Sequence, residues 1–325
     1  MLADGVAPDT VMYNAVINAC EKSGRVREAF DLYEEMQEAD VAPSTITFNS
    51  LISACAKAGQ LKAALVVFRQ MKRSTKASFG TVVPDAITYN SLITVCGKAL
   101  RWEEALGLFE EMKDIGLKPD VYTYTALISA CGSSGRCRES VQVFDSMRGD
   151  GVIPNKATYN SLINACARAG EWQRALVYYD EMEGAVGVKA DKITYAVLVR
   201  ALGAAGRWDA ALAMFEGMKS RGVEADSYVY DAIIGACEKN NQWRLASELF
   251  EEMKEAGMET EGVAITGRNI LYSWPMALSM VPAPLIRAAK MAVDAGSRAR
   301  EVIDIERKRL VADGYLQEDS LKAKK

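Results

Sequence analysis

The chain has 325 residues, half of them apolar and a quarter charged, so it can bury a core and is not mostly disordered. Its 39 basic and 43 acidic side chains give a formal net charge of −4, which does not by itself indicate nucleic acid. The sequence contains no histidine. This excludes Ser-His-Asp and Cys-His catalysis, histidine zinc sites and histidine pH switches. No apolar run reaches the roughly 18 residues that a membrane span needs.

Prolines mark a period of about 35 residues along the chain. Pro8, Pro43, Pro84, Pro119 and Pro154 are separated by 35, 41, 35 and 35 residues. Dividing the chain after each Pro-X step predicts seven repeats, which cover residues 10–44, 45–85, 86–120, 121–155, 156–191, 192–226 and 227–261. The six extra residues of the second repeat fall within 73–83, a polar stretch that we interpret as a tolerated surface loop.

Each repeat has the pattern of two helices. In the first repeat, Val16, Ile17 and Cys20 follow helical spacing, and Gly24 ends the helix because glycine adopts the left-handed conformation at little cost. A second apolar stripe consists of Val26, Ala29, Phe30, Tyr33 and Met36. One helix pair cannot bury both of its faces, but stacked pairs can. We therefore predict an all-α fold, a right-handed α-solenoid of helix-turn-helix repeats whose first helices line one concave face.

The third repeat carries the most specific motifs. It reads Tyr-Asn-Ser-Leu-Ile at 89–93, Glu-Ala-Leu-Gly-Leu-Phe-Glu-Glu-Met at 104–112 and Gly-Leu-Lys-Pro-Asp at 116–120. This unit resembles the pentatricopeptide repeat family of the P type. The tetratricopeptide family, with 34 residues, lacks the Pro-Asp ending and normally reads Trp-x-x-Leu-Gly.

The resemblance implies binding of single-stranded RNA in mitochondria or chloroplasts, with one base read by each repeat. In the family, the fifth and last residues of a repeat select the base. The first five such pairs here are Asn14 and Ser44, Asn49 and Asp85, Asn90 and Asp120, Thr125 and Asn155, and Asn160 and Asp191. The family pattern assigns cytosine to Asn-Ser, uracil to Asn-Asp and adenine to Thr-Asn, so the implied element is 5′-CUUAU-3′. Ala196 and Asp231, in repeats six and seven, depart from the pattern and receive no base.

The resemblance also makes the second residue of each repeat a packing contact beside the base. Val11, Ile46, Ile87, Tyr122 and Ile193 suit this role because they are apolar or aromatic, whereas Ala157 is a weak point.

The thirteenth residue is basic in five of the seven repeats. These residues are Lys22, Lys57, Lys98, Arg168 and Lys239. At equivalent positions of a solenoid they should form a row that contacts RNA phosphates. The alternative interpretation is that they simply complement the C-terminal dipole of the first helices, and both roles can hold at once.

The two ends of the chain differ from the repeats. Residues 1–9 match the last nine residues of a repeat, so we expect a truncated upstream repeat, and the absence of a transit peptide carries no information on location. Residues 262–325 are basic on balance, and we expect a divergent helical cap or tail that contacts RNA or a protein partner only as a secondary possibility.

Residue patterns for catalysis, metals and cofactors are missing. Six of the seven cysteines occupy one position of their repeats, which indicates core packing rather than a metal site, and the seventh, Cys137, begins a helix. No Walker loop, Gly-x-Gly-x-x-Gly or Cys-x-x-Cys occurs. Glu-Glu pairs such as Glu110 and Glu111 are interpreted as a solvated face. We therefore expect an RNA-binding protein that is not an enzyme and has no cofactor, membrane or small-molecule substrate. The alternative is a protein-binding solenoid scaffold without RNA readout.

Overall fold

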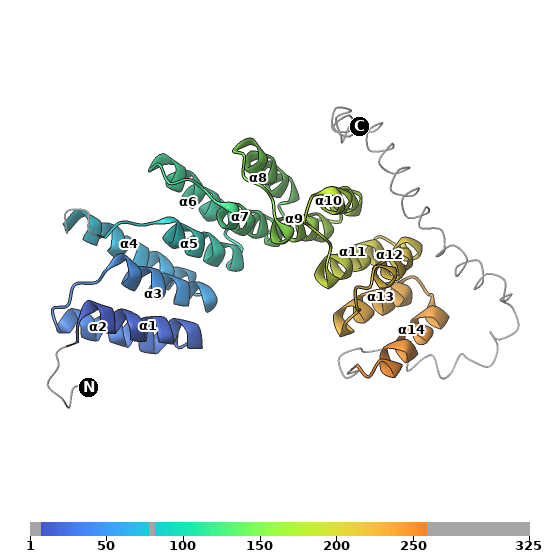
Figure 1. The fold of residues 1–325 in the computed structure, drawn as a ribbon, viewed down its shortest axis with the longest axis horizontal. Coiled ribbons are helices and arrows are strands. Elements are labelled where there is room, and N and C mark those ends of the chain that lie inside the picture. Colours follow the sequence, from blue (N-terminus) through green and yellow to red (C-terminus); the bar gives the residue numbers. More distant parts are fainter. Residues whose placement is uncertain (1–7, 78–81, 259–325) are drawn as a thin grey trace, which may run out of the picture. The chain divides into compact units, whose positions relative to one another are not determined.

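The computed structural model describes residues 8–77 and 82–258, and these residues form fourteen α-helices and no strand (Figure 1). The all-α prediction is therefore confirmed. Within this part of the chain, none of the helices combines the length and apolar character needed to cross a bilayer. The expectations for residues 1–7 and for the tail from 262 lie outside the described residues.

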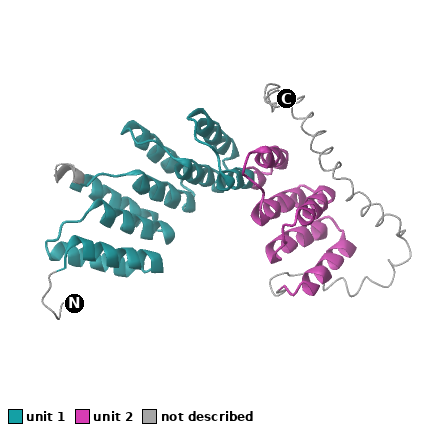
Figure 2. Cartoon of the chain, viewed as in Figure 1, with its two compact units in different colours: residues 1–165 teal, residues 166–325 magenta. Residues whose placement is uncertain are grey.

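The chain divides into two compact units, residues 1–165 and 166–325 (Figure 2). The first unit contains α1 (Thr10–Ser23), α2 (Val26–Glu38), α3 (Thr45–Lys57), α4 (Leu61–Ala77), α5 (Ala86–Lys98), α6 (Trp102–Asp114), α7 (Val121–Ser133) and α8 (Cys137–Gly149). The second contains α10 (Trp172–Gly184), α11 (Lys192–Ala204), α12 (Trp208–Ser220), α13 (Ser227–Lys239) and α14 (Trp243–Glu255), and α9 (Lys156–Arg168) runs across the boundary.

Consecutive helix pairs stack in the same way within each unit. In the first unit, α1 packs on α3, α3 on α5 and α5 on α7, and each of these first helices also packs on the second helix of its own pair. In the second unit, α11 packs on α13, and α12 and α14 pair with them. Neighbouring first helices therefore form one layer in each unit, so equivalent residues on them lie in rows.

The last residue of each repeat starts the next first helix. Asp85 accepts a hydrogen bond from the backbone N–H of Thr88 at 2.9 Å, and the hydroxyl of Thr88 accepts one from the backbone N–H of Asp85 at 3.1 Å. This reciprocal capping box satisfies two backbone donors that an uncapped helix would leave unpaired. Asp9, Ser44, Asp120, Asp191 and Asp226 also accept a hydrogen bond from the first turn of the helix they precede.

Aromatic rings join each repeat to the next. A ring of the second helix meets the ring at the fourth residue of the following repeat edge to face. The pairs are Tyr33–Phe48, Phe68–Tyr89, Phe109–Tyr124, Phe144–Tyr159, Tyr179–Tyr195 and Phe215–Tyr230, with ring centroids 5.3–5.9 Å apart. This recurring contact sets the stacking of one pair on the next in a geometry that aromatic quadrupoles favour.

Candidate nucleic-acid interface

The first three predicted base-selecting pairs are brought together in the first unit. The amide nitrogen of Asn14 donates to the Ser44 hydroxyl at 3.0 Å. Asn49 donates to both carboxylate oxygens of Asp85 at 3.0 and 3.1 Å. The corresponding distance from the Asn90 amide nitrogen to the carboxylate of Asp120 is 3.4 Å. Fifth and last residues that are about 30 positions apart in sequence thus form one polar site between two adjacent first helices.

The fourth pair is arranged differently. The Thr125 hydroxyl lies 2.8 Å from the hydroxyl of Thr158, while Asn155 caps the first turn of α9 by accepting from the backbone N–H of Thr158 at 3.0 Å. Asn160 lies on α9 in the first unit, whereas Asp191 caps α11 in the second.

The two repeats that depart from the family pattern differ at the fifth residue. The Ala196 side chain is fully buried, so it faces the core. Asp226, the last residue of that repeat, forms an ion pair with Lys192 at 3.0 Å. Asp231 is exposed, and Glu261 lies outside the described residues.

Sequence reasoning missed the threonine at the third residue of repeats two to six. These residues are Thr47, Thr88, Thr123, Thr158 and Thr194, and all are buried. The hydroxyls of Thr47 and Thr88 each lie 2.5 Å from the amide oxygen of the fifth residue of the preceding repeat, Asn14 and Asn49 respectively. Their recurrence three residues after each Asp, Asn or Ser cap is a capping-box signal in the sequence.

The second residues of the repeats face solvent. The exposed fraction is 72% for Val11, 59% for Ile46, 60% for Ile87, 71% for Tyr122 and 55% for Ile193. Apolar side chains that are exposed at one repeated position form a row rather than scattered surface residues, and such a row can pack against planar groups. The side chain of Ala157 is exposed at the same position but offers little area.

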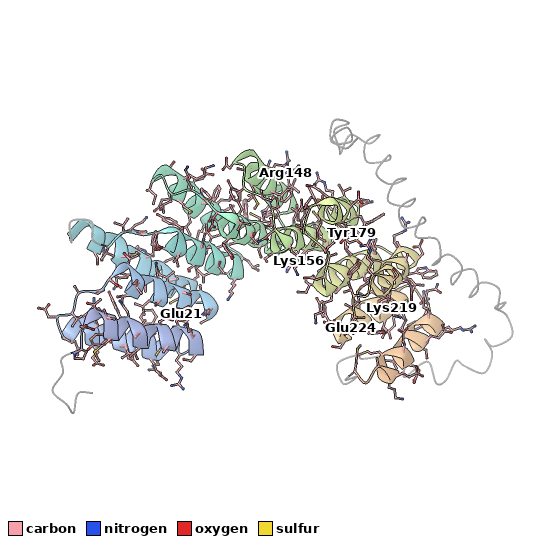
Figure 3. The ribbon with its side chains drawn as sticks, viewed as in Figure 1. Glu21, Arg148, Lys156, Tyr179, Lys219 and Glu224 are labelled. Atoms are coloured by element: carbon pink, nitrogen blue, oxygen red, sulfur yellow. The ribbon has the colours of Figure 1, made fainter. Side chains whose placement is uncertain are left out.

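The basic thirteenth residues end the first helices, and two of them contact the preceding repeat. The ammonium group of Lys98 donates to the carbonyl oxygens of Ala56 and Lys57 at 2.8 and 3.1 Å, at the C-terminus of α3. Lys57 pairs with Glu21 at 2.9 Å. Figure 3 labels Glu21, which lies on α1. Lys22, Arg168 and Lys239 are exposed at the ends of α1, α9 and α13. These contacts support the helix-dipole interpretation for Lys98 and leave all five cations at the surface.

Hydrogen bonds favour the ionised form of the Asp120 carboxyl group. Burial by itself would raise the pKa of the Asp120 carboxyl group, but hydrogen bonds from the backbone and hydroxyl of Thr123 and from Asn90 bring this pKa below its ordinary value. Asp120 is therefore a carboxylate, which only accepts hydrogen bonds, at neutral pH.

The structure corrects the interpretation of the Glu-Glu pairs. Their first members, such as Glu110, are exposed, but the second member accepts a hydrogen bond from the buried tyrosine at the fourth residue of its repeat. The contacts are Tyr13 to Glu35 at 3.2 Å, Tyr89 to Glu111 at 2.6 Å and Tyr230 to Glu252 at 2.8 Å. A buried phenol needs a polar partner, so half of each pair is structural rather than merely solvated.

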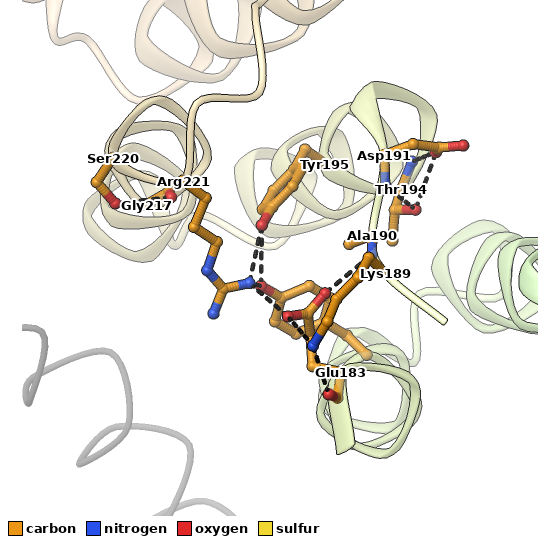
Figure 4. A network of polar contacts seen from close by, with 10 residues as sticks. Glu183, Lys189, Ala190, Asp191, Thr194, Tyr195, Gly217, Ser220 and Arg221 are labelled. Carbon is orange, nitrogen blue, oxygen red and sulfur yellow. Dashed lines mark hydrogen bonds and ion pairs between the residues drawn. The ribbon is translucent and has the colours of Figure 1, made fainter. Parts of the chain in front are cut away.

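In the sixth repeat an arginine, rather than a glutamate, is the hydrogen-bond partner of the buried tyrosine at the fourth residue. Arg221, at the end of α12, donates to the hydroxyls of Tyr179 and Tyr195 at 2.7 and 2.9 Å and to the carboxylate of Glu183 at 2.9 Å (Figure 4). Figure 4 also shows Thr194 donating to Asp191 at the start of α11. The cluster links the fifth repeat to the sixth.

All seven cysteines are buried, and none is part of a disulfide. Burial raises the pKa of the Cys55, Cys96 and Cys131 thiols to about 11, so these thiols are protonated at neutral pH. Cys137, which begins α8, is 3% exposed. Within the described residues, no three acidic or cysteine side chains are grouped as metal ligands.

The helix pairs, their repeated caps and the paired fifth and last residues define a helical-repeat protein. The family model for the pentacotripeptide-repeat region of PRORP matches residues 5–200, and two further models of the PPR repeat match residues 191–238 and 228–258. The chain belongs to the pentatricopeptide repeat family.

Two solved structures share this fold. The pentatricopeptide repeat protein PPR10 in complex with an 18-nt psaJ RNA element is 21% identical, with a TM-score of 0.57 over 80% of this chain and 42% of that one. PPR10 from maize is 24% identical, with a TM-score of 0.50 over 76% of this chain and 39% of that one. The chain thus spans less than half of the length of these structures. A comparison with curated proteins found no match.

Proposed function

We propose that this protein binds single-stranded RNA and reads one base with each of its first five repeats, with the element 5′-CUUAU-3′. The observation that carries the proposal is the pairing of Asn14 with Ser44, Asn49 with Asp85 and Asn90 with Asp120 at 3.0–3.4 Å. Amide, hydroxyl and carboxylate groups supply donors and acceptors for the Watson–Crick edge of a base. PPR10, which shares the fold, has been solved with an RNA element.

The surroundings of the pairs suit an extended strand. The exposed second residues, such as Ile46 and Ile87, flank each pair and can pack on the faces of unstacked bases. The basic thirteenth residues stand eight positions further along the same helices, about 12 Å along the axis. An extended strand that crosses the first helices would bring its phosphates near these cations, and their charge favours binding to phosphates.

We further propose that binding serves organellar RNA stabilisation, processing or translation, in mitochondria or chloroplasts, without a reaction catalysed by these repeats. A repeat array that holds RNA extended shields it from nucleases and opens local structure. Protein contacts through the tail from 262 remain part of this proposal as a secondary possibility.

The test is fluorescence anisotropy of the full chain with short labelled RNAs at one near-physiological salt concentration. An oligomer containing CUUAU is compared with a scramble of the same composition and with the DNA equivalent. We expect preference for CUUAU RNA, with each mismatched base costing about 1–3 kcal/mol.

A repeat-swap variant makes the test specific. Thr125→Asn with Asn155→Asp should lose affinity for CUUAU and regain it when the A of the element becomes U. Equal, weak and salt-independent binding of all three oligomers would contradict the proposal and would favour a protein-binding scaffold instead.

A further inference from the structure

The buried threonine at the third residue of a repeat contacts the base-selecting residue of the repeat before it. Thr47 and Thr88 are fully buried, and neither can reach solvent or RNA directly. Their hydroxyls nevertheless lie 2.5 Å from the amide oxygens of Asn14 and Asn49. A buried hydroxyl at this distance affects how the amide presents itself to a ligand.

The hydrogen bonds of Thr47 give its hydroxyl a defined direction. Its oxygen accepts the backbone N–H of Ser44 at 2.9 Å, which leaves its single hydrogen to be donated elsewhere. The 2.5 Å separation from Asn14 Oδ1 fits an O–H···O bond and is too short for N–H···O. The amide oxygen of Asn14 therefore faces Thr47, and its nitrogen faces Ser44 at 3.0 Å.

The second repeat has the same arrangement with an additional constraint. Thr88 accepts the backbone N–H of Asp85 at 3.1 Å and contacts Asn49 Oδ1 at 2.5 Å. Here the partner of the Asn49 amide nitrogen is a carboxylate, which only accepts, so Asp85 alone would also orient the amide. The Ser44 hydroxyl can donate or accept, so in the first repeat the orientation depends on Thr47.

Amide orientation matters because it determines the order of donor and acceptor offered to a pyrimidine. With one N–H and one oxygen lone pair already used, each asparagine retains one N–H and one lone pair. Uracil presents a donor at N3 and an acceptor at O4, whereas cytosine presents an acceptor at N3 and a donor at N4. The amide orientation is the same in the first two repeats, so the difference between cytosine and uracil there depends on the last residue, Ser44 or Asp85. Turning the amide over would exchange its donor and acceptor and remove the preference that each pair has for its own pyrimidine.

We propose that Thr47 is a positioning residue for base selection by the first repeat, and that Thr88 serves the second repeat redundantly with Asp85. The threonine hydroxyl accepts a backbone N–H, which orients its own hydrogen toward the amide oxygen of the asparagine in the preceding repeat. This inference rests on the proposed function, since it concerns how the same pairs distinguish pyrimidines.

The third repeat supplies a matched control. Thr123 is equally buried and forms the same capping box, with its hydroxyl 2.9 Å from Asp120 Oδ1. The amide oxygen of Asn90, by contrast, has no hydrogen-bond partner. Thr47→Val, Thr88→Val and Thr123→Val each remove a hydroxyl from the same kind of capping box, so we expect a similar loss of stability from all three. They differ in whether the lost hydroxyl contacts an asparagine amide.

The experiment measures pyrimidine discrimination by the full chain rather than affinity alone. Anisotropy at fixed salt compares CUUAU with UUUAU, CCUAU and CUCAU for the wild type and for Thr47→Val, Thr88→Val and Thr123→Val. Thr47→Val should reduce discrimination at the first base by about five-fold or more, by the scale of base readout. Thr88→Val and Thr123→Val should change discrimination at the second and third bases less than about two-fold.

Two further variants separate positioning from folding. Thr47→Ser keeps the hydroxyl and should restore discrimination at the first base. Ser44→Asp combined with Thr47→Val gives Asn14 an acceptor-only partner, so the first repeat should discriminate without Thr47 and should now prefer uracil, as the Asn-Asp pair of the second repeat is proposed to do. This variant tests the positioning role even if Thr47→Val alone fails to fold.

The contradicting outcomes are distinct. If the wild type does not discriminate at any base, the proposed function fails and this inference with it. If the wild type discriminates and Thr47→Val does so equally, or if Thr123→Val loses as much at the third base, the positioning role is overturned while the proposed function stands.

Discussion

At the residue scale, Leu100 occupies a backbone position that most repeats fill with glycine. The fifteenth residue of each repeat, at the end of the first helix, has a positive φ, and it is glycine in five of the seven repeats, as at Gly24 and Gly135, both with φ of 73°. The third repeat has Leu100 there with φ of 58°, and its side chain is 56% exposed. An exposed leucine side chain gains little free energy from burial, and its Cβ atom makes the left-handed backbone conformation unfavourable.

We expect Leu100→Gly to raise the free energy of unfolding by about 1 kcal/mol, because it removes this strain without removing a buried contact. Denaturation in urea, followed by circular dichroism, measures the change. Gly135→Ala is the reciprocal control and should lower the free energy by a similar amount. Destabilisation by Leu100→Gly would show that the leucine contributes packing that outweighs its backbone cost.

At the element scale, close approach of neighbouring first helices depends on small residues. A Cβ atom added to Gly203 of α11 would lie 2.8 Å from the Cα atom of Ala236 on α13. This is shorter than a van der Waals contact, and a backbone atom cannot move away by a change of rotamer. Gly97 and Gly132 meet Ala130 and Ala165 in the same way in the first unit. The absence of a methyl group at these glycines therefore sets part of the helix spacing, and with it the spacing of the pairs that we propose select bases.

Gly203→Ala should lower the free energy of unfolding by about 2 kcal/mol through overpacking of α11 against α13. Gly107 of α6 is the matched control, because it also lies inside a helix but has no atom within 4 Å of an added Cβ. Gly107→Ala should raise the free energy by up to about 1 kcal/mol, as helix propensity predicts. Urea denaturation of both variants tests this, and equal effects of the same sign would refute the close-packing argument.

At the scale of the whole molecule, the formal charge of −4 conceals a separation of charge. Acidic side chains such as Glu34 and Glu110 are exposed on second helices, whereas the basic thirteenth residues end the first helices. A polyanion would be drawn to the ends of the first helices despite the net negative charge, because local potential governs the encounter.

We expect the charge-neutralising variant Lys22→Gln, Lys57→Gln and Lys98→Gln to weaken RNA binding similarly for all sequences. It should also reduce the magnitude of the slope of log affinity against log salt by about 2, since each lost phosphate contact on a single strand contributes about 0.7. Anisotropy titrations at several salt concentrations measure the slope.

The matched control neutralises three exposed basic residues at the eighteenth position, on second helices, as Arg27→Gln, Lys62→Gln and Arg138→Gln. It removes the same charge and should leave the slope nearly unchanged. An equal change in both variants would show that the effect is one of net charge rather than of phosphate contact.

Much of the fold was predictable because its determinants are local and repeat. Gly24 marks the end of a first helix, Pro43 marks the end of a repeat, and the apolar stripe from Val26 to Met36 has the helical period. The helix pairs could therefore be predicted without tertiary information. The base-selecting pairs were located only through the resemblance to a family. Nothing local in the sequence shows that residue 14 meets residue 44.

The sequence by itself determined the repeat length, the all-α class and the identity of the fifth, last and thirteenth residues, because backbone propensity and hydrophobic period act over a few residues. Only the tertiary structure decided that Thr47 and Thr88 contact Asn14 and Asn49, that Lys98 meets the end of α3, and that Glu111 serves a buried tyrosine. These contacts join residues 22 to 42 positions apart. Their partners depend on how one helix pair stacks on the next, which the packing of complete side chains determines.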